Sequence, residues 1–198
     1  MSRPRARVPA AEVTLAVLTG GRSRRMGRDK ASMPVEGGRV LGALGAEALR
    51  GLYAEVLTAG PPVPGLAARA VADALPGAGP LSGVVAALED ARTPLVVVIA
   101  CDMPRLSSAL VSGLLGEAAG GSRRVTLCRG PNGLEPLPSV WRREAASDLR
   151  RQLAGGVRAL RDAVSAAGPR VVEPDRWRRW DPVGASFLSW NALGEVER

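Results

Sequence analysis

The chain has 198 residues, of which 46% are hydrophobic and 3% aromatic, and its formal net charge is +8. This length and apolar content favour a soluble globular protein with a full core and exclude a disordered chain. No apolar run approaches the ~20 residues that span a bilayer, and residues 1–10 lack the apolar stretch of a signal peptide. We therefore expect a cytoplasmic protein with a disordered basic tail over residues 1–10 and a single domain over residues 11–198.

The positive charge comes almost entirely from arginine, because Lys30 is the single lysine among 27 basic residues. The arginines are spread along the chain, and no segment interleaves them with aromatic residues into a stacking platform for bases. The charge therefore favours attraction of a small polyanion such as a nucleotide over a nucleic-acid interface. The chain has no histidine, which excludes histidine-based acid–base chemistry. Cys101 and Cys128 lie far apart in apolar runs, so we expect two buried thiols rather than a metal site.

The first half of the chain alternates short apolar runs with segments of helical periodicity. Residues 13–19 are apolar, partly β-branched and followed by a glycine pair, which predicts a buried strand. The periodicity predicts helices over residues 40–52 and 81–91 and further strands over residues 55–59 and 69–72. Residues 95–100 are apolar throughout, which is typical of a central parallel strand covered on both faces.

The second half continues the same alternation. A helix is predicted over residues 107–119, with Ser107 or Ser108 as its N-cap. Strands at 124–128, 137–140 and 171–172 and helices at 142–153 and 157–166 follow, while the tail over 176–198 is poorly patterned. Residues 120–138 are rich enough in glycine and proline for an excursion from the sheet. The repeated order of strand and helix predicts an α/β fold with a mostly parallel sheet.

A glycine-rich basic loop follows the first strand. The pair Gly20-Gly21 allows backbone N–H groups to approach a phosphate or a base without obstruction from a Cβ atom. Lys30 ends the loop with a compact ammonium group, which acts as a point charge, whereas an arginine would offer a planar guanidinium. The loop has neither the ending of a P-loop nor the glycine spacing of a dinucleotide fingerprint. Its remaining positive charge comes from Arg22, Arg24, Arg25 and Arg28.

Two aspartates also fall where predicted strands end. Asp73 follows the strand over residues 69–72, and Asp102 follows the strand over residues 95–100. Ligands of parallel sheets bind at the carboxyl ends of the strands, so both carboxylates should face the same crevice as the basic loop. A carboxylate in this position suits Mg²⁺, which takes one or two carboxylates together with substrate phosphates.

These residues carry a family resemblance. The run Leu18-Thr19-Gly20-Gly21-x-Ser23-x-Arg25-Met26-Gly27-x-Asp29-Lys30 closely resembles the signature of nucleotidyltransferases with a Rossmann-like NTP-transferase fold. The molybdenum cofactor guanylyltransferases of the MobA type are the nearest match. The resemblance covers roughly residues 13–160 and continues through Asp73, residues 79–83, residues 101–104 and residues 135–137.

The resemblance implies a three-layer α/β/α sandwich and Mg²⁺-dependent transfer of GMP from GTP to the terminal phosphate of molybdopterin, with release of pyrophosphate. GTP and molybdopterin would then be the small-molecule partners. The resemblance also implies transient contacts with other cofactor-biosynthesis proteins or with acceptor apoenzymes. It implies no binding to nucleic acid or to a membrane. The implied catalytic residues are Lys30, Asp102 and Arg25, with Asp102 as the metal ligand. The implied nucleotide-binding residues are Leu18, Thr19, Gly20, Gly21, Lys30, Thr58, Asp73 and Asp102.

The C-terminus departs from the family pattern. Relatives carry a stretch Phe-x-Asn-x-Asn-Thr-Pro, whereas this chain has Ser189 at the first asparagine and Asn191 at the second. Two alternatives share the fold and the loop: cytidylyl transfer to molybdopterin and guanylyl transfer to 2-phospholactate. The departure at Ser189 adds a third alternative, a nucleotide-binding homologue without turnover, although the presence of both Lys30 and Asp102 counts against it.

Overall fold

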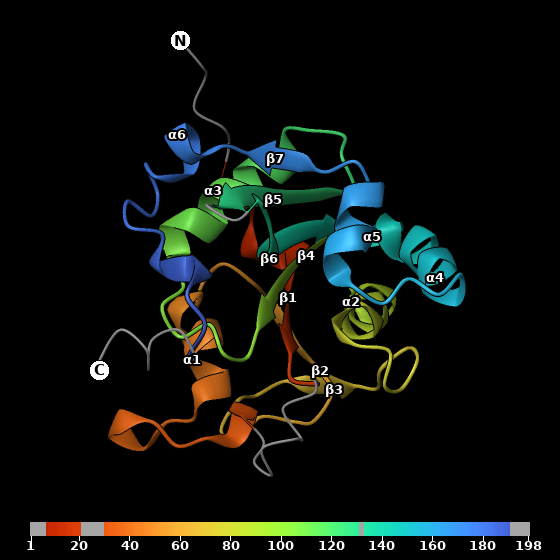
Figure 1. Cartoon of the computed structure of the whole chain (residues 1–198). Coiled ribbons are helices and arrows are strands. Elements are labelled where there is room, and N and C mark those ends of the chain that lie inside the picture. The colour runs from red at the N-terminus through yellow and green to blue at the C-terminus, as the bar shows by residue number, and fades with distance from the viewer. Residues whose placement is uncertain (1–6, 21–29, 131–132, 191–198) are drawn as a thin grey trace.

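The computed structural model describes residues 7–20, 30–130 and 133–190, and its described part is built on one seven-stranded sheet (Figure 1). The strand order across the sheet is β3-β2-β1-β4-β6-β5-β7. The strands are β1 (Val13–Leu18), β2 (Glu55–Ala59), β3 (Arg69–Val71), β4 (Leu95–Ala100), β5 (Val125–Gly130), β6 (Gly133–Arg142) and β7 (Arg170–Val172).

The sheet is mostly parallel, as predicted. β1 pairs in parallel with both β2 and β4, β2 pairs in parallel with β3, and β5 pairs in parallel with β7. Only β6 runs antiparallel to its neighbours, β4 and β5, among the described strands. All strands predicted from the sequence are present within a few residues of their expected ends.

The predicted excursion over residues 120–138 is wrong. This segment contains β5 and the first half of β6, which lie inside the sheet and pair with each other. Gly130 stands opposite Gly133 at the end of this pair, and Gly133 adopts a positive φ of 103°. Glycine has no Cβ atom and therefore adopts left-handed backbone easily, which suits the change of direction between these two strands.

Helices cover both faces of the sheet and make the three layers that the resemblance implies (Figure 1). One face carries α2 (Pro80–Asp90), α4 (Ala146–Ala154) and α5 (Leu160–Ala166), and the other carries α1 (Leu41–Ala48) and α3 (Ser108–Ala119). The short helix α6 (Pro174–Trp177) packs beside α3 through Trp177. Of the two serines proposed as cap, Ser107 is the N-cap of α3, and its hydroxyl accepts a hydrogen bond from the Leu110 N–H at 3.2 Å.

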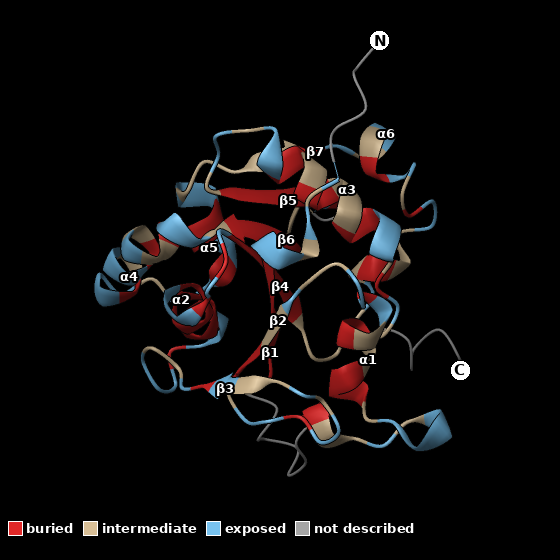
Figure 2. Ribbon diagram, turned by 180° about the vertical axis from the view of Figure 1, so that it is seen from behind, coloured by how far each residue is buried: buried red, intermediate tan, exposed pale blue. Residues whose placement is uncertain are grey.

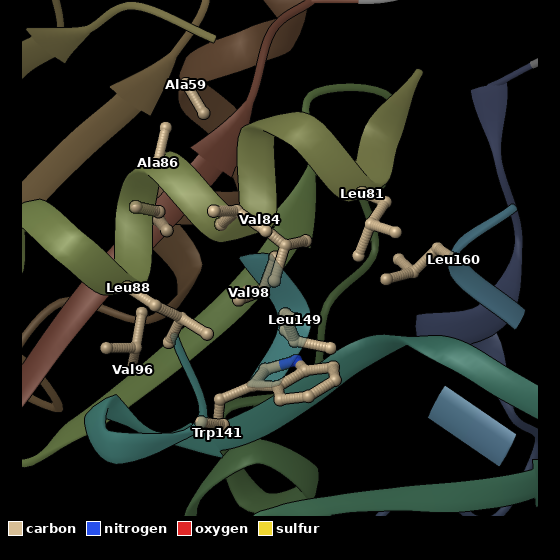
Figure 3. Packing of buried hydrophobic residues seen from close by; sticks show 14 of the residues in the cluster. Ala59, Leu81, Val84, Ala86, Leu88, Val96, Val98, Trp141, Leu149 and Leu160 are labelled. Carbon is tan, nitrogen blue, oxygen red and sulfur yellow. The ribbon is translucent and has the colours of Figure 1, made fainter. Parts of the chain in front are cut away.

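The two faces of the central strands explain why β1 and β4 are apolar throughout. Ala16 and Leu18 of β1 pack against α2, while Leu15 and Val17 point to the opposite core beneath α3. Figure 2 shows the resulting buried centre of the sheet. Figure 3 shows the α2 side of the core, in which Leu81, Val84 and Leu88 lie near Val98, Leu149, Leu160 and the buried ring of Trp141.

Two boundaries differ from those predicted. The helix expected over residues 142–153 begins only at Ala146, because β6 extends to Arg142 and a short helical turn, Arg143–Ala145, follows it. At the N-terminus, Val8 packs against the core and a helical turn begins at Ala10, so residues 8–10 are structured in spite of the tail expected there. Among the described residues, no helix is both long and apolar enough to cross a membrane.

Candidate functional site

Lys30 and Asp102 meet at the carboxyl edge of the sheet. Asp102 comes two residues after the end of β4, and Lys30 opens the helical turn Lys30–Ser32. The Lys30 Nζ atom lies 3.5 Å from the Asp102 Oδ2 atom, and the two side chains are 18% and 22% exposed. The structure thus brings together the two residues that the sequence singles out for phosphate and metal chemistry.

Backbone contacts fix both partners of this pair. The Cys101 N–H donates to the Leu18 carbonyl at 3.1 Å, which continues the pairing of β1 with β4 up to Asp102. On the other side, α1 presses against the turn that carries Lys30. A Cβ atom at Gly42 would lie 2.8 Å from the Ala31 carbonyl oxygen, so only glycine allows this close approach.

The turn after β1 is tied to the end of β2. The N–H groups of Thr19 and Gly20 both donate to the Ala59 carbonyl, at 3.0 and 3.1 Å, and the Thr19 hydroxyl donates to the Pro61 carbonyl at 2.7 Å. A base that binds beside this turn therefore meets two N–H groups that already have an acceptor. The predicted nucleotide contacts from the backbone of Leu18, Thr19 and Gly20 stay a prediction.

Asp73 lies between the end of β1 and the first turn of α2. A Cβ atom built at Gly20 would lie 3.5 Å from the Asp73 Oδ2 atom, and one at Gly83 would lie 3.5 Å from Oδ1. The Asp73 carboxylate therefore lies beside both glycines. Burial raises the pKa of the Asp73 carboxyl above its ordinary value.

Ser82 holds the segment after Asp73 in place, a role that sequence reasoning missed. Its fully buried hydroxyl accepts from the Leu75 N–H at 2.7 Å and donates to the Leu75 carbonyl at 2.9 Å. The Ala74 N–H also donates to the Ser82 carbonyl, at 3.4 Å. The only sequence signal was the position of this serine in the run over residues 79–83, on which the family resemblance partly rests.

Thr58 does not lie in the crevice. It stands opposite Val17 in the register of β2 with β1, so it points toward the core beneath α1 and α3. Its side chain is fully buried, and its hydroxyl has no hydrogen-bond partner. The position leaves it without access to a bound nucleotide. Gly21 and Arg25 belong to residues 21–29, and Asn191 to residues 191–198, all of which lie outside the described residues.

Comparisons with known proteins match this arrangement. The family model described as a MobA-like NTP transferase domain matches residues 15–191. The chain belongs to this family. A relative from Chloroflexus aggregans, named probable molybdenum cofactor guanylyltransferase, is 37% identical over 187 residues, which are 91% of this chain and 90% of the relative. The protein is thus a nucleotidyltransferase.

Solved structures with the same fold are more distant in sequence. The molybdopterin-guanine dinucleotide biosynthesis protein A from Archaeoglobus fulgidus superposes with a TM-score of 0.73 at 22% identity, covering 93% of this chain and 95% of that one. A Mycobacterium tuberculosis protein, Rv0371C, described as a complex with manganese, gives a TM-score of 0.59 at 16% identity, covering 83% and 88%. These similarities support the fold.

The carboxylates of the MobA-like domain fit a metal ion that takes most of its ligands from a bound substrate. No group of three or more histidine, cysteine, aspartate or glutamate side chains that could hold an ion occurs within residues 7–20, 30–130 and 133–190. Asp102 offers a partly exposed carboxylate beside Lys30. Magnesium commonly takes one or two carboxylates and completes its shell with phosphates and water, so one aspartate suffices if a nucleotide is bound.

The two cysteines of this nucleotidyltransferase differ in their surroundings. Cys128 is fully buried, as predicted, and burial raises the pKa of its thiol to about 12, with further contributions from the charges of Glu135 and Asp181. Cys101 is only half-buried, so the expectation of a second buried thiol is wrong. It still packs against the core, but it belongs to the loop after β4 that carries Asp102 and is therefore not fully covered.

A substitution at Gly60 tests the importance of the hydrogen bonds between the turn after β1 and the end of β2. A Cβ atom there would lie 2.6 Å from the Gly20 N atom, and the residue has a φ of +113°. We expect Gly60→Ala to displace the turn after β1 and to weaken nucleotide binding, measured by calorimetric titration. Gly65→Ala is the matched control, because Gly65 also has a positive φ but open space around it.

The two variants share the cost of left-handed backbone, roughly 1–3 kcal/mol, and differ in the clash. Gly60→Ala should therefore have the lower Tm, by about 2–4 °C for each extra 1 kcal/mol in a domain of this size. Equal Tm values and equal nucleotide affinities for the two variants would show that the close approach at Gly60 has no consequence.

Proposed function

We propose that the protein transfers GMP from GTP to the terminal phosphate of molybdopterin, with release of pyrophosphate and with Mg²⁺ as cofactor. The observation that carries the proposal is the meeting of Lys30 and Asp102 at the carboxyl ends of β1 and β4. It is supported by the name of the relative from Chloroflexus aggregans, which matches 91% of this chain. The site roles of Lys30, Arg25 and Asp73 are part of this proposal.

The reaction forms a bond between an oxygen of the acceptor phosphate and the α-phosphorus of GTP. It breaks the bond from that phosphorus to the oxygen of the leaving pyrophosphate. A phosphate nucleophile is already ionised at neutral pH, so the absence of histidine from the chain removes nothing that the reaction requires. Because both reactants are anionic, the protein contributes mainly by aligning them and by offsetting their repulsion.

Lys30 would supply the fixed positive charge for the phosphates. Asp102 would hold Mg²⁺, which when bound supplies further charge stabilisation on the triphosphate. The 3.5 Å separation of Nζ and Oδ2 exceeds the 2.7–2.9 Å typical of a strong charge-assisted hydrogen bond. The carboxylate is thus held near the lysine without a tight bond to it, which favours its use for a metal.

We expect the site to prefer guanine over adenine. Guanine presents an O6 acceptor and two adjacent donors, N1–H and N2–H₂, and carbonyl or carboxylate oxygens can accept hydrogen bonds from these donors. The N–H groups of Thr19 and Gly20 already donate to the Ala59 carbonyl, so the O6 acceptor needs a donor from another group. An unpaired buried polar group costs roughly 1–3 kcal/mol, so the number of unmatched groups decides the preference. The half-buried carboxylate of Asp73 is an acceptor within this region.

Steady-state rates with GTP, CTP, ATP and UTP, with molybdopterin as acceptor, test the proposal. We expect kcat/KM for GTP to exceed that for ATP by about tenfold or more for each mispaired group, since 1.36 kcal/mol corresponds to a factor of ten. Equal values for GTP and ATP would contradict the guanine site. A preference for CTP would assign cytidylyl transfer instead, and turnover only with 2-phospholactate would assign the other acceptor.

The same proposal extends to the setting of the protein. A cytoplasmic location, a single NTP-transferase domain over residues 11–198 and transient contacts with other cofactor-biosynthesis proteins or acceptor apoenzymes stay predictions. Partners other than small molecules are testable by pull-down with the purified full chain. Nucleic acid and membrane are expected to be absent from the partners.

A further inference from the structure

The C-terminal segment over residues 180–190 returns to the loop that carries Asp102. The Trp190 N–H donates to the backbone carbonyl of Asp102 at 2.8 Å. The Ser107 N–H, at the far end of the same loop, donates to the Ser186 hydroxyl at 2.8 Å. Both ends of the loop between β4 and α3 are therefore tied to one distant segment.

Asp181 orients the serine that makes the second of these ties. Its carboxylate is only 5% exposed and accepts from the N–H groups of Ala185, at 3.2 Å, and Ser186, at 2.9 Å. A buried carboxylate is tolerated when such donors satisfy it. The two bonds shape the helical turn Ala185–Phe187 and present the buried Ser186 hydroxyl to Ser107. The Ser107 hydroxyl in turn donates to the Trp180 carbonyl at 3.1 Å.

The segment over residues 180–190 packs against α3 and against Trp177. The Trp180 ring occupies the space that a Cβ atom at Gly113 would need. Phe187 meets the ring of Trp177 edge-on, with centroids 5.0 Å apart, and the Trp177 indole N–H donates to the Arg129 carbonyl at 2.9 Å. Figure 1 shows this last described stretch of the chain beside α3. The segment can thus act as a fixed support rather than a loose tail.

We propose that Ser186 and Asp181 are positioning residues for Asp102, because they fix the loop from which the Asp102 carboxylate faces Lys30. The inference rests on the proposed role of Asp102 as the metal ligand. Groups that orient a metal ligand change metal affinity when they are removed, typically by about 10–100-fold. Binding of the nucleotide without metal should depend much less on this support, since Asp73 and the turn after β1 are held by other contacts.

Ser186→Ala removes the acceptor of the Ser107 N–H and changes little volume. Its matched control is Ser139→Ala, because Ser139 is also fully buried and also accepts one N–H, from the Trp141 indole at 2.9 Å. Mn²⁺ serves as the probe, titrated by electron paramagnetic resonance in the presence of GTP without acceptor. We expect Ser186→Ala to weaken Mn²⁺ binding about tenfold, with GTP affinity in EDTA unchanged, and Ser139→Ala to alter neither.

Two further variants make the result decisive. Asp181→Asn should reproduce the loss of Mn²⁺ affinity, and Ser186→Ala should add nothing in an Asp102→Asn background, since coupled sites are non-additive. If Ser186→Ala lowers the Tm as Ser139→Ala does but binds Mn²⁺ like the wild type, the segment is only structural and the inference is overturned. If Asp102→Asn itself binds Mn²⁺ like the wild type, the metal assignment fails and this inference falls with it.

Discussion

Lys30→Ala is expected to lower kcat/KM by about 10²–10³-fold, the range found when one preorganised charge-stabilising group is lost. The Lys30 ammonium lies 3.5 Å from the Asp102 carboxylate. In its proposed role, its removal takes a fixed positive charge away from the phosphates of a bound nucleotide. Lys30→Arg should restore activity only in part, because a planar guanidinium places its charge and donors differently. Initial rates across a series of GTP concentrations, with Mg²⁺ saturating, measure the effect.

Arg39→Ala is the control for loss of a positive charge. Arg39 forms an exposed ion pair with Glu47 at 3.5 Å and lies outside the proposed machinery. An exposed pair contributes little to stability, so this variant should keep both its fold and its rate. Turnover of Lys30→Ala close to that of Arg39→Ala would remove Lys30 from the catalytic residues.

Asp102→Asn is expected to reduce turnover about a hundredfold or more, since a loss of ~3 kcal/mol of transition-state stabilisation corresponds to two orders of magnitude. The amide keeps the size of the side chain and removes the negative charge that a hard cation needs. The rate should also lose most of its dependence on Mg²⁺ concentration. Rates measured across a Mg²⁺ series, with GTP held constant, give both quantities.

Asp90→Asn is the matched control for this substitution. Asp90 ends α2 and pairs with Arg69 at 2.9 Å on the surface, away from the carboxyl edge of β4. It should leave the rate and the Mg²⁺ response unchanged. An Asp102→Asn enzyme with a normal rate and a normal Mg²⁺ response would show that the metal is held elsewhere.

Elements with a strong local signal agree with the sequence-based prediction. The strands at Glu55–Ala59 and Leu95–Ala100 have the predicted bounds, because both are short, rich in apolar or β-branched residues and flanked by residues that end a strand. The sequence narrowed the cap of α3 to Ser107 or Ser108, because an N-cap hydroxyl accepts from the backbone of the first helical turn, and the structure shows this bond at Ser107. The proximity of Lys30 and Asp102 followed from a general rule, because parallel strands carry their ligand-binding residues at one edge.

Features that depend on partners far away in the sequence became visible in the folded structure. Thr58 faces the core because the register with Val17 assigns its side of the sheet, and a single strand pattern does not specify that side. The antiparallel insertion of β6 between β4 and β5 likewise depends on pairing across the sheet. Trp190 reaches Asp102 through a backbone N–H, a group that every residue except proline carries. Such contacts leave no trace in residue type, so the support of the loop that carries Asp102 becomes visible only once the chain is folded.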